Sequence, residues 1–252
     1  MTHLYVLTGA SRGMGLAMAE QLLSPEHQVL CISRQLNPSL ADHAAAVGCA
    51  LTQWTADLSK PEAVAERLRL WLQSLPLTSL DSATLINNAG VIPPLVPLRA
   101  ALPIDTAQAL RVGLEAPMLL SSAFLQATGA FSGPRKVLNI SSGLGRRAMG
   151  SQAAYCAAKA GMDHFTRCLA LDEASLSNGA RVCSLAPGVI DTDMQTQLRG
   201  ADPVNFPDRA GFAQLKDAGQ LTTPTEAARR VLDWLHRADY GAQAVADVRD
   251  AL

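Results

Sequence analysis

The stretch LYVLTGASRGMGLAMAEQLL at residues 4–23 decides the fold. Residues 4–8 are apolar and predict a buried strand, and residues 16–23 have the pattern of an amphipathic helix. Glycines between a strand and a helix leave backbone N–H groups and a helix N-terminus available to a pyrophosphate. The spacing Gly9-x-x-x-Gly13-x-Gly15 differs from the general fingerprint G-x-G-x-x-G, so this loop needs support from the rest of the chain.

Strand and helix patterns alternate along the remaining sequence. Short aliphatic or β-branched runs predict strands at 29–33, 51–54, 84–86, 137–140, 181–185 and 245–248. Helices are predicted at 60–75, from residue 152 onward and at 225–236. This alternation implies a parallel sheet with its site at the carboxyl ends of the strands. Because no repeat, low-complexity tract or linker interrupts the pattern, we expect an α/β fold: a single doubly wound Rossmann domain over residues 1–252, with helices on both faces of the sheet.

The composition excludes several classes of protein. The chain has 252 residues, 48% of them hydrophobic and 17% charged, and a formal net charge of −1. These values are typical of a globular enzyme and offer no basic field for nucleic acid. No apolar run approaches the length of a membrane span, and residues 4–8 are too short for a signal-peptide core, so we expect no membrane partner and a cytoplasmic location. The cysteines and histidines have neither disulfide nor metal-ligand spacing, so no metal is expected.

A second stretch carries candidate catalytic residues. Ser141 and Ser142 follow the predicted strand 137–140, and Tyr155 and Lys159 are four residues apart on the next predicted helix. Residues four apart share one helix face, so this pair and a serine at the strand end can reach the same carbonyl oxygen. Taken alone, a tyrosine and a lysine at this spacing are usually a half-buried aromatic residue beside a solvated cation, and two serines after a strand are usually a turn. The glycine loop supports a catalytic interpretation of this pair, because it indicates a site for the same ligand.

The glycine loop also permits a rival interpretation. Residues 9–13 satisfy G-x-S-x-G, the nucleophile elbow of serine hydrolases, with Ser11 as the nucleophile. His164 or His236 would then have to serve as the base. In that hydrolase fold several strands normally precede the elbow, whereas here it would follow the first strand. The hydrolase interpretation also leaves Gly15 and the pair of Tyr155 and Lys159 without a role.

Two arginines favour a phosphorylated dinucleotide. A dinucleotide fold commonly has an acidic residue about twenty positions after the glycines, which binds the ribose 2′-hydroxyl, whereas an arginine there accommodates a 2′-phosphate. No acidic residue occurs from Cys31 to Gln35, and Arg34 and Arg12 provide two guanidinium groups. We therefore expect NADP rather than NAD. Two solvated surface arginines are the alternative. Asp57, after the third strand, is expected to bind an adenine amino group.

On these motifs the chain resembles the short-chain dehydrogenase/reductase family along nearly its whole length. The matching segments are Thr8-Gly9-x-x-x-Gly13-x-Gly15, Asp57, Asn87-Asn88-Ala89-Gly90, Ser142, Tyr155-x-x-x-Lys159 and Pro187-Gly188. The interval between Ser142 and Tyr155 favours Ser142 over Ser141. Within the family, residues 191–195, 205–207 and 219–221 resemble the group of sepiapterin and benzil reductases.

The resemblance implies roles for individual residues. Tyr155 would donate a proton to the carbonyl oxygen while hydride arrives from the nicotinamide. Lys159 would lower the pKa of Tyr155 and bind the ribose hydroxyls, and Ser142 would donate to the same carbonyl oxygen. Thr192 would contact the carboxamide of the nicotinamide. The expected cofactor-binding residues are Gly9, Ser11, Arg12, Gly13, Met14, Gly15, Arg34, Asp57, Leu58, Asn88, Ala89, Gly90, Tyr155, Lys159, Pro187, Gly188, Ile190 and Thr192.

The chain departs from the family pattern at Gly113. Family members usually have asparagine in a Val-Asn-Leu stretch that helps to hold a water for proton relay, and here the stretch is Val112-Gly113-Leu114. Glycine would let the helix bend and leave room for a water at backbone carbonyls. Otherwise the enzyme is slow, or the protein is a non-catalytic scaffold that binds NADPH.

The segment 193–221 is expected to form a partly helical flap over the substrate, with a surface excursion as the alternative. The expected pocket residues are Leu144, Ile190, Met194, Leu198, Phe206 and Phe212. Because these are uncharged, the expected substrate is a small, neutral carbonyl compound of aromatic, diketone or pterin-like character. The family resemblance implies a homodimer or homotetramer. Leu119, Leu120 and Phe124 are expected either in the core or on the helix face used for dimerisation.

Overall fold

The computed structural model describes residues 2–250, and the elements below lie within that range. The strands are β1 (His3–Thr8), β2 (His27–Ser33), β3 (Ala50–Thr55), β4 (Ser82–Asn87), β5 (Arg135–Ile140), β6 (Arg181–Ala186) and β7 (Val245–Asp247). The α-helices are α1 (Gly13–Gln21), α2 (Pro38–Val47), α3 (Pro61–Ser74), α4 (Pro103–Leu110), α5 (Ala116–Ala127), α6 (Ala153–Ala174), α7 (Asp193–Arg199), α8 (Arg209–Asp217) and α9 (Pro224–His236). A π-helical segment, η3 (Arg111–Glu115), joins α4 to α5, and a 3₁₀ turn, η4 (Gly143–Gly145), follows β5.

The strands form one parallel sheet of seven strands in the order β3-β2-β1-β4-β5-β6-β7. The fold class expected from the sequence is therefore confirmed, and each predicted strand is present with its ends shifted by at most two residues. The helix predicted at 16–23 begins earlier, at Gly13, because the last turn of the glycine loop is already helical. Helix α2 was not predicted, although Asn37 caps it and Pro38 occupies its first turn.

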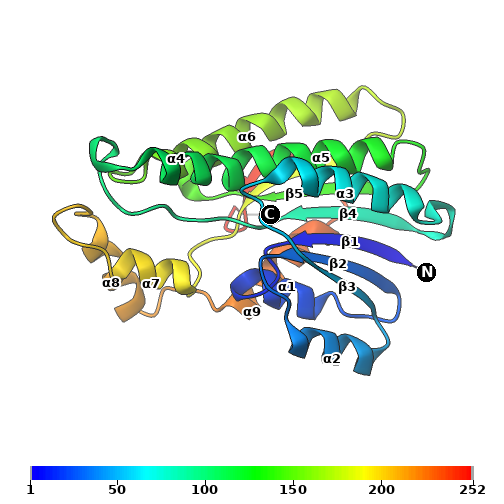
Figure 1. Cartoon of the computed structure of the whole chain (residues 1–252), viewed down its shortest axis with the longest axis horizontal. Coiled ribbons are helices and arrows are strands. Elements are labelled where there is room, and N and C mark those ends of the chain that lie inside the picture. Colours follow the sequence, from blue (N-terminus) through cyan, green and yellow to red (C-terminus); the bar gives the residue numbers. More distant parts are fainter. Residues whose placement is uncertain (1, 251–252) are drawn as a thin grey trace.

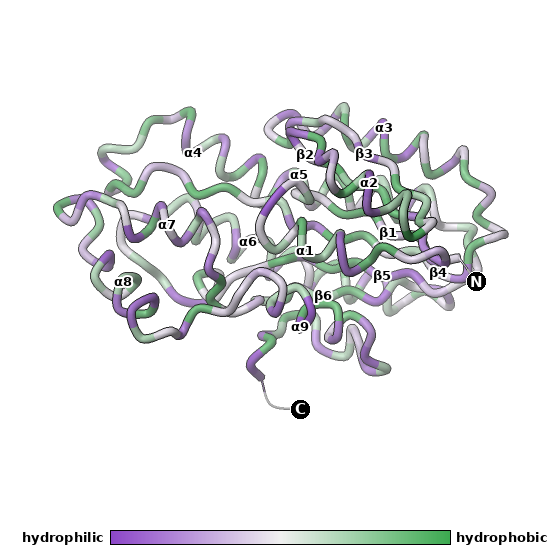
Figure 2. The backbone as a smooth tube through the Cα atoms, turned by 90° about the horizontal axis from the view of Figure 1, so that it is seen from below, coloured by the Kyte–Doolittle hydropathy of each residue, from purple (hydrophilic) through white to green (hydrophobic). Residues whose placement is uncertain are grey.

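Helices cover both faces of the sheet (Figure 1). Helices α1, α2 and α9 bury apolar residues against one face, and α3 and α5 bury theirs against the other. Helix α6 lies on the same side as α5. In Figure 2 hydrophobic residues run along α1 and along β1, the strand that it covers. Leu120 and Phe124 of α5 are fully buried and Leu119 packs against the same cluster, so the three residues belong to the core.

The helix that follows β4 is interrupted at the position where the family has asparagine. Residues Arg111–Glu115 form the π-helical segment, with Gly113 at its middle. A Cβ atom at Gly113 would lie 3.0 Å from the Cβ of Ala158 on α6. The helix is thus irregular at Gly113, and α6 approaches so closely here that a side chain does not fit without a shift. The room for a relay water at Gly113 stays a prediction.

The order of the strands places a crevice at the carboxyl ends of β1 and β4. The chain runs outward from β1 to β2 and β3 on one side, and from β4 to β5, β6 and β7 on the other. Such a reversal separates the loops above the two neighbouring strands, and open α/β sheets bind their ligands there. Helices α7 and α8 project beyond this end of the sheet (Figure 1). Between residues 2 and 250, no helix combines the length and the apolar character that a membrane crossing requires.

Candidate active site

The glycine loop is held against the end of β4. Asn88 Nδ2 donates to the carbonyl oxygens of Thr8 (3.0 Å) and Gly9 (3.2 Å). In return, Thr8 Oγ1 accepts from the backbone N–H groups of Asn88 (2.9 Å) and Ala89 (3.0 Å). A Cβ atom at Gly15 would lie 2.1 Å from the carbonyl oxygen of Gly9, so only glycine permits this turn. The loop is thereby fixed at the crevice between β1 and β4.

The first turn of α1 opens into this crevice. Arg12 occupies the N-cap position, and its side chain makes no capping hydrogen bond. Backbone N–H groups at an uncapped helix start are donors for an anion. Arg12 Nη1 instead donates to Asp193 Oδ2 at 2.9 Å, which joins the glycine loop to the start of α7.

The neighbouring strand ends carry the other predicted dinucleotide contacts. Arg34 follows β2 and is exposed, and in the part of the chain that the structure describes it forms no ion pair. Asp57 is exposed after β3 and accepts from the N–H of Ser59 at 2.9 Å. That hydrogen bond lowers the pKa of Asp57, and the charge of Arg34 contributes to the same shift. Leu58 beside it is buried.

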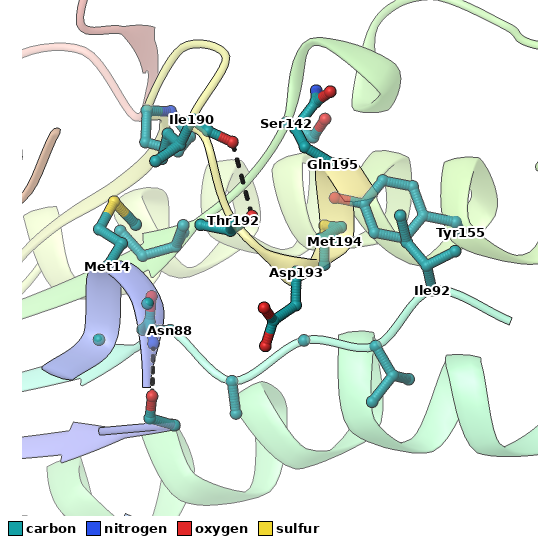
Figure 3. A pocket seen from close by; sticks show the side chains of 18 of the residues that line it. Met14, Asn88, Ile92, Ser142, Tyr155, Ile190, Thr192, Asp193, Met194 and Gln195 are labelled. Carbon is teal, nitrogen blue, oxygen red and sulfur yellow. Dashed lines mark hydrogen bonds between the residues drawn. The ribbon is translucent and has the colours of Figure 1, made fainter. Parts of the chain in front are cut away.

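Ser142, Tyr155 and Lys159 meet where β5 ends and α6 begins. Ser142 Oγ accepts from the N–H of Leu144 at 3.2 Å, which leaves its O–H free to donate. Lys159 Nζ donates to the carbonyl oxygen of Ile140 at 2.7 Å and lies 5.9 Å from the centre of the Tyr155 ring. In Figure 3 the phenol oxygen of Tyr155 points toward the segment that carries Met194 and Gln195. The three groups expected from the sequence are thus brought together.

Burial has the largest effect on the pKa values of Tyr155 and Lys159. It raises the pKa of Tyr155 above its ordinary value, and the Ser142 hydroxyl opposes the shift without cancelling it. Burial also lowers the pKa of Lys159 to about 8. The Lys159 ammonium is bonded to a backbone carbonyl, and loss of water around the phenol has the largest effect on the pKa of Tyr155. The predicted lowering of that pKa by Lys159 stays a prediction.

One cavity of about 850 Å³ connects the glycine loop with the Tyr155 group. All of the residues expected to bind cofactor or to act in catalysis line it. They are Gly9, Ser11, Arg12, Gly13, Met14, Gly15, Arg34, Asp57, Leu58, Asn88, Ala89, Gly90, Ser142, Tyr155, Lys159, Pro187, Gly188, Ile190 and Thr192. Their individual roles stay predictions, but the fold places them around a single space.

The flap consists of α7, α8 and their connections. Asp191 pairs with Lys216 of α8 and, at 3.6 Å, with Arg199 of α7, and these pairs fasten both helices to the segment that follows β6. Phe206 stacks on Phe212 with ring centres 5.7 Å apart.

Most of the expected substrate pocket is present. Leu144, Ile190, Met194, Leu198 and Phe212 line the cavity. Phe206 does not: it is 0% exposed and packs with Leu198 of the flap and with Leu95, which lies outside the flap. Its assignment to the pocket is wrong, because the apolar pattern of the segment does not distinguish a side chain that faces the ligand from one that anchors the flap to the rest of the protein.

Two glutamines at the cavity received no role from the sequence. Gln152, just before α6, is 1% exposed, and neither polar atom of its amide has a hydrogen-bond partner among residues 2–250. Gln195 on α7 is 6% exposed, and its Oε1 is likewise unpartnered. Both line the cavity with Tyr155. An unpaired buried amide is costly, so these groups are suited to a polar ligand. Only the folded flap buries Gln195, so no local pattern could identify it.

The geometry does not support the hydrolase interpretation. Ser11 lines the cavity, but within residues 2–250 no histidine does so. His164 is exposed on α6. His236, at the end of α9, makes its contact with Tyr5, at 3.3 Å between His236 Nε2 and the phenol oxygen. Ser11 therefore has no base to activate it.

Comparisons with known proteins place the chain among short-chain dehydrogenases. The sequence model of a family described as short chain dehydrogenase matches residues 3–202. A benzil reductase ((S)-benzoin forming) of Bacillus cereus is 32% identical over 235 residues, which cover 93% of this chain and 94% of the relative. A sepiapterin reductase of Bos taurus is 33% identical over 261 residues, which cover 98% and 94%. A crystal structure of a metagenomic short-chain oxidoreductase (SDR) in complex with NADP matches with a TM-score of 0.72 and 26% identity, covering 97% of this chain and 94% of that one.

Proposed function

The chain belongs to the short-chain dehydrogenase family, in the group of benzil and sepiapterin reductases, and we propose that it uses NADPH to reduce a small, neutral ketone or diketone to the alcohol. The observation that carries this proposal is the continuous cavity, which has the glycine loop at one end and Ser142, Tyr155 and Lys159 at the other. A dinucleotide at the glycine loop and a carbonyl compound at Tyr155 would share this one cavity.

The cofactor end of the cavity fits a phosphorylated dinucleotide. The uncapped start of α1 provides N–H donors for a pyrophosphate. Arg34 has no ion-pair partner among the residues described, and Arg12 has only an exposed partner, so both guanidinium groups can be recruited by a 2′-phosphate. When bound, the nicotinamide supplies the hydride. The similar crystal structure of a metagenomic short-chain oxidoreductase in complex with NADP supports this choice.

Residues of this chain supply the proton that the carbonyl oxygen receives during reduction. Burial keeps the Tyr155 phenol protonated, so it can donate to a carbonyl oxygen that becomes negative during reduction. The free O–H of Ser142 can donate to the same oxygen and stabilise its charge. Lys159, fixed by the carbonyl of Ile140, places a cation below the phenol, where it stabilises the phenolate that remains after proton transfer.

The substrate end favours a compound with apolar surface and a second polar group. Leu144, Met194 and Phe212 provide apolar walls. The unpartnered amide of Gln152 offers a donor and an acceptor beside them, and the unpartnered Oε1 of Gln195 offers a further acceptor. A vicinal diketone or a pterin-like compound has such a combination, and the names of the benzil and sepiapterin reductases support the same chemistry.

The test is NADPH oxidation by the purified protein against a panel of benzil, aliphatic vicinal diketones, sepiapterin, simple aryl ketones and simple aliphatic ketones. We expect turnover of the diketones or the pterin, with Ser142→Ala as a matched variant of reduced activity. Ester hydrolysis is measured in parallel as a control. Failure of every carbonyl compound, together with normal NADPH binding, would contradict the proposed reduction.

That last outcome would instead support the second candidate, a non-catalytic scaffold that binds NADPH. Its support is Gly113, where the family's relay asparagine is absent and the helix is π-helical. Tight NADPH binding in the absence of turnover, unchanged by Gly113→Asn, would identify the scaffold.

We also propose a homodimer or homotetramer. Leu110 of α4, Met118 of α5 and Leu171 of α6 expose apolar surface on the helical layer formed by these three helices. A second copy would cover such surface. Light scattering after size exclusion tests this, with Leu171→Lys and Met118→Lys expected to weaken association. A monomer at all concentrations would contradict it. A cytoplasmic location stays a prediction.

A further inference from the structure

A buried carboxylate lies one helical turn beyond Lys159. Asp163 on α6 is 2% exposed and does not line the cavity. Its Oδ1 accepts from the hydroxyls of Ser141 (2.6 Å) and Ser184 (2.7 Å). Its Oδ2 lies 3.3 Å from Arg146 Nε. A carboxylate is buried at high cost unless hydrogen bonds and an opposite charge compensate it, and here both are present. These hydrogen bonds and the ion pair fix the carboxylate in place, although the proposed reaction gives Asp163 no role.

The partners of Asp163 hold the loop that carries Ser142. Ser141 precedes Ser142 directly, and Arg146 follows it after the turn η4. Between them, Gly145 packs so closely on α6 that a Cβ atom there would lie 2.9 Å from Asp163 Oδ2. Arg146 Nη2 also donates to the carbonyl of Ala246 on β7 at 2.7 Å. The carboxylate therefore fixes the loop on both sides of Ser142.

Asp163 also supplies negative charge near Lys159. The direct partners of the Lys159 ammonium are uncharged: the carbonyl oxygen of Ile140 at 2.7 Å and the sulfur of Met162 at 3.9 Å. Burial lowers the pKa of Lys159 to about 8, and the charge of Asp163 opposes that shift.

The other titratable groups around this pair do not replace that charge. Tyr155 on α6 and Cys183 on β6 are neutral near pH 8, because burial raises the pKa of the phenol and raises that of the thiol to about 12. Arg146 on the loop is a cation and would disfavour a second positive charge. Removal of the Asp163 charge should therefore lower the pKa of the Lys159 ammonium further.

We propose that Asp163 is a positioning residue, which holds the Ser142 loop against α6 through Ser141 and Arg146 and places a negative charge one helical turn beyond Lys159. Its effect on Lys159 and on the loop is independent of the substrate. Its effect on turnover rests on the proposed carbonyl reduction.

The first test measures the charge of Lys159 directly. The chain has four lysines, Lys60, Lys136, Lys159 and Lys216, so the side-chain signals of ¹³C-lysine-labelled protein are few and can be titrated by NMR, with Lys159→Arg identifying the signal of Lys159. Asp163→Asn keeps the size of the side chain and removes its charge. Ser184→Ala is the matched control, since it removes one hydrogen bond and keeps the charge.

In Asp163→Asn we expect Lys159 to lose its proton at a pH lower by roughly one unit, the low end of the effect of a nearby opposite charge. In Ser184→Ala the midpoint should stay close to that of the unmodified chain. An unchanged or higher midpoint in Asp163→Asn, in protein that still binds NADPH, would overturn the role assigned to the charge. This readout needs no substrate, so it remains decisive even if no carbonyl compound is reduced.

The second test addresses the Ser142 loop. If Asp163 positions Ser142, the cost of Ser142→Ala should be smaller in the Asp163→Asn background than in the unmodified chain, because the hydroxyl is then already misplaced. The alkaline limb of kcat/KM should also move to lower pH in Asp163→Asn by about the same amount as the NMR midpoint. Equal costs of Ser142→Ala in both backgrounds would overturn the role in the loop. Absence of turnover in the unmodified chain would count against the proposed function alone.

Discussion

Arg12 and Asp193 form an ion pair of 2.9 Å between the glycine loop and the first turn of α7, across the mouth of the cavity. Both side chains are largely exposed, so the pair itself contributes about 0–1 kcal/mol. Its position matters more than its strength, because the guanidinium expected to bind a 2′-phosphate is already engaged by the flap.

Removal of this competitor should favour NADPH. In Asp193→Asn we expect NADPH to bind up to about fivefold more tightly, which corresponds to the free energy of an exposed pair. Fluorescence titration of NADPH measures this. Asp208→Asn is the matched control, because Asp208 is an exposed flap residue whose side chain makes no cap hydrogen bond. Weaker NADPH binding in Asp193→Asn would show that the pair supports the site rather than competing with it.

Arg34→Asp should change the choice of dinucleotide. Arg34 is exposed at the end of β2 and lines the cavity. A hydrogen bond to a charged group contributes about 1.5–3 kcal/mol, so its loss should weaken NADPH binding by roughly 10–100-fold. NADH should bind as well as before or better, because an acid at this position can bind a ribose hydroxyl. The ratio of kcat/KM for the two cofactors is the measurement, and an unchanged ratio would refute the assignment of Arg34.

Tyr155→Phe should separate binding from chemistry. The substitution removes only the phenol oxygen of a buried ring, so NADPH affinity and thermal stability should change little. Turnover should fall by about 10²–10⁴, the contribution of a general acid. Stopped-flow measurement of NADPH oxidation at saturating substrate determines the rate. Turnover within a fewfold of the unmodified chain would mean that another group donates the proton.

Burial of Lys159 should appear in the pH dependence of stability. Its pKa is about 8 in the folded protein against an ordinary value of 10.5, so between these values the unfolded chain binds more protons. The contribution of Lys159 to the free energy of unfolding therefore rises with pH over this range, by about 2–3 kcal/mol in all. Urea unfolding of the unmodified chain and of Lys159→Met at pH 7 and pH 10 tests this. The difference between the two proteins should shift in favour of the unmodified chain at pH 10, and a constant difference would contradict the prediction.

Gly113→Ala should disturb the contact between η3 and α6. The added Cβ would lie 3.0 Å from that of Ala158, one residue before Lys159, so the helices must separate slightly. We expect a loss of about 1–3 kcal/mol in stability, typical of overpacking, and a lower turnover because Lys159 moves with α6. Thermal melts and NADPH oxidation provide the two readouts. Gly113→Asn belongs in the same series: a gain in turnover there, despite the crowding, would show that the missing asparagine limits proton relay.

The sequence by itself was sufficient for the parallel fold, the glycine loop and the pair of Tyr155 and Lys159. These features are encoded locally: a strand by a few β-branched or aliphatic residues, a phosphate loop by glycines at one junction, and a shared helix face by a spacing of four. The cavity collects every residue expected from these patterns, since the carboxyl ends of parallel strands meet at one edge of the sheet.

Only the tertiary structure decided where other side chains point and which charges meet. Phe206 and Phe212 have the same local signal, yet Phe206 is buried between the flap and Leu95, and Phe212 lines the cavity. Arg12 and Asp193 are 181 positions apart, and Asp163 on α6 gathers Ser141 and Arg146 from the loop after β5 and Ser184 from β6. Burial and pairing of this kind depend on which segments pack together, and the loss of water that shifts the pKa values of Tyr155 and Lys159 arises only from that packing.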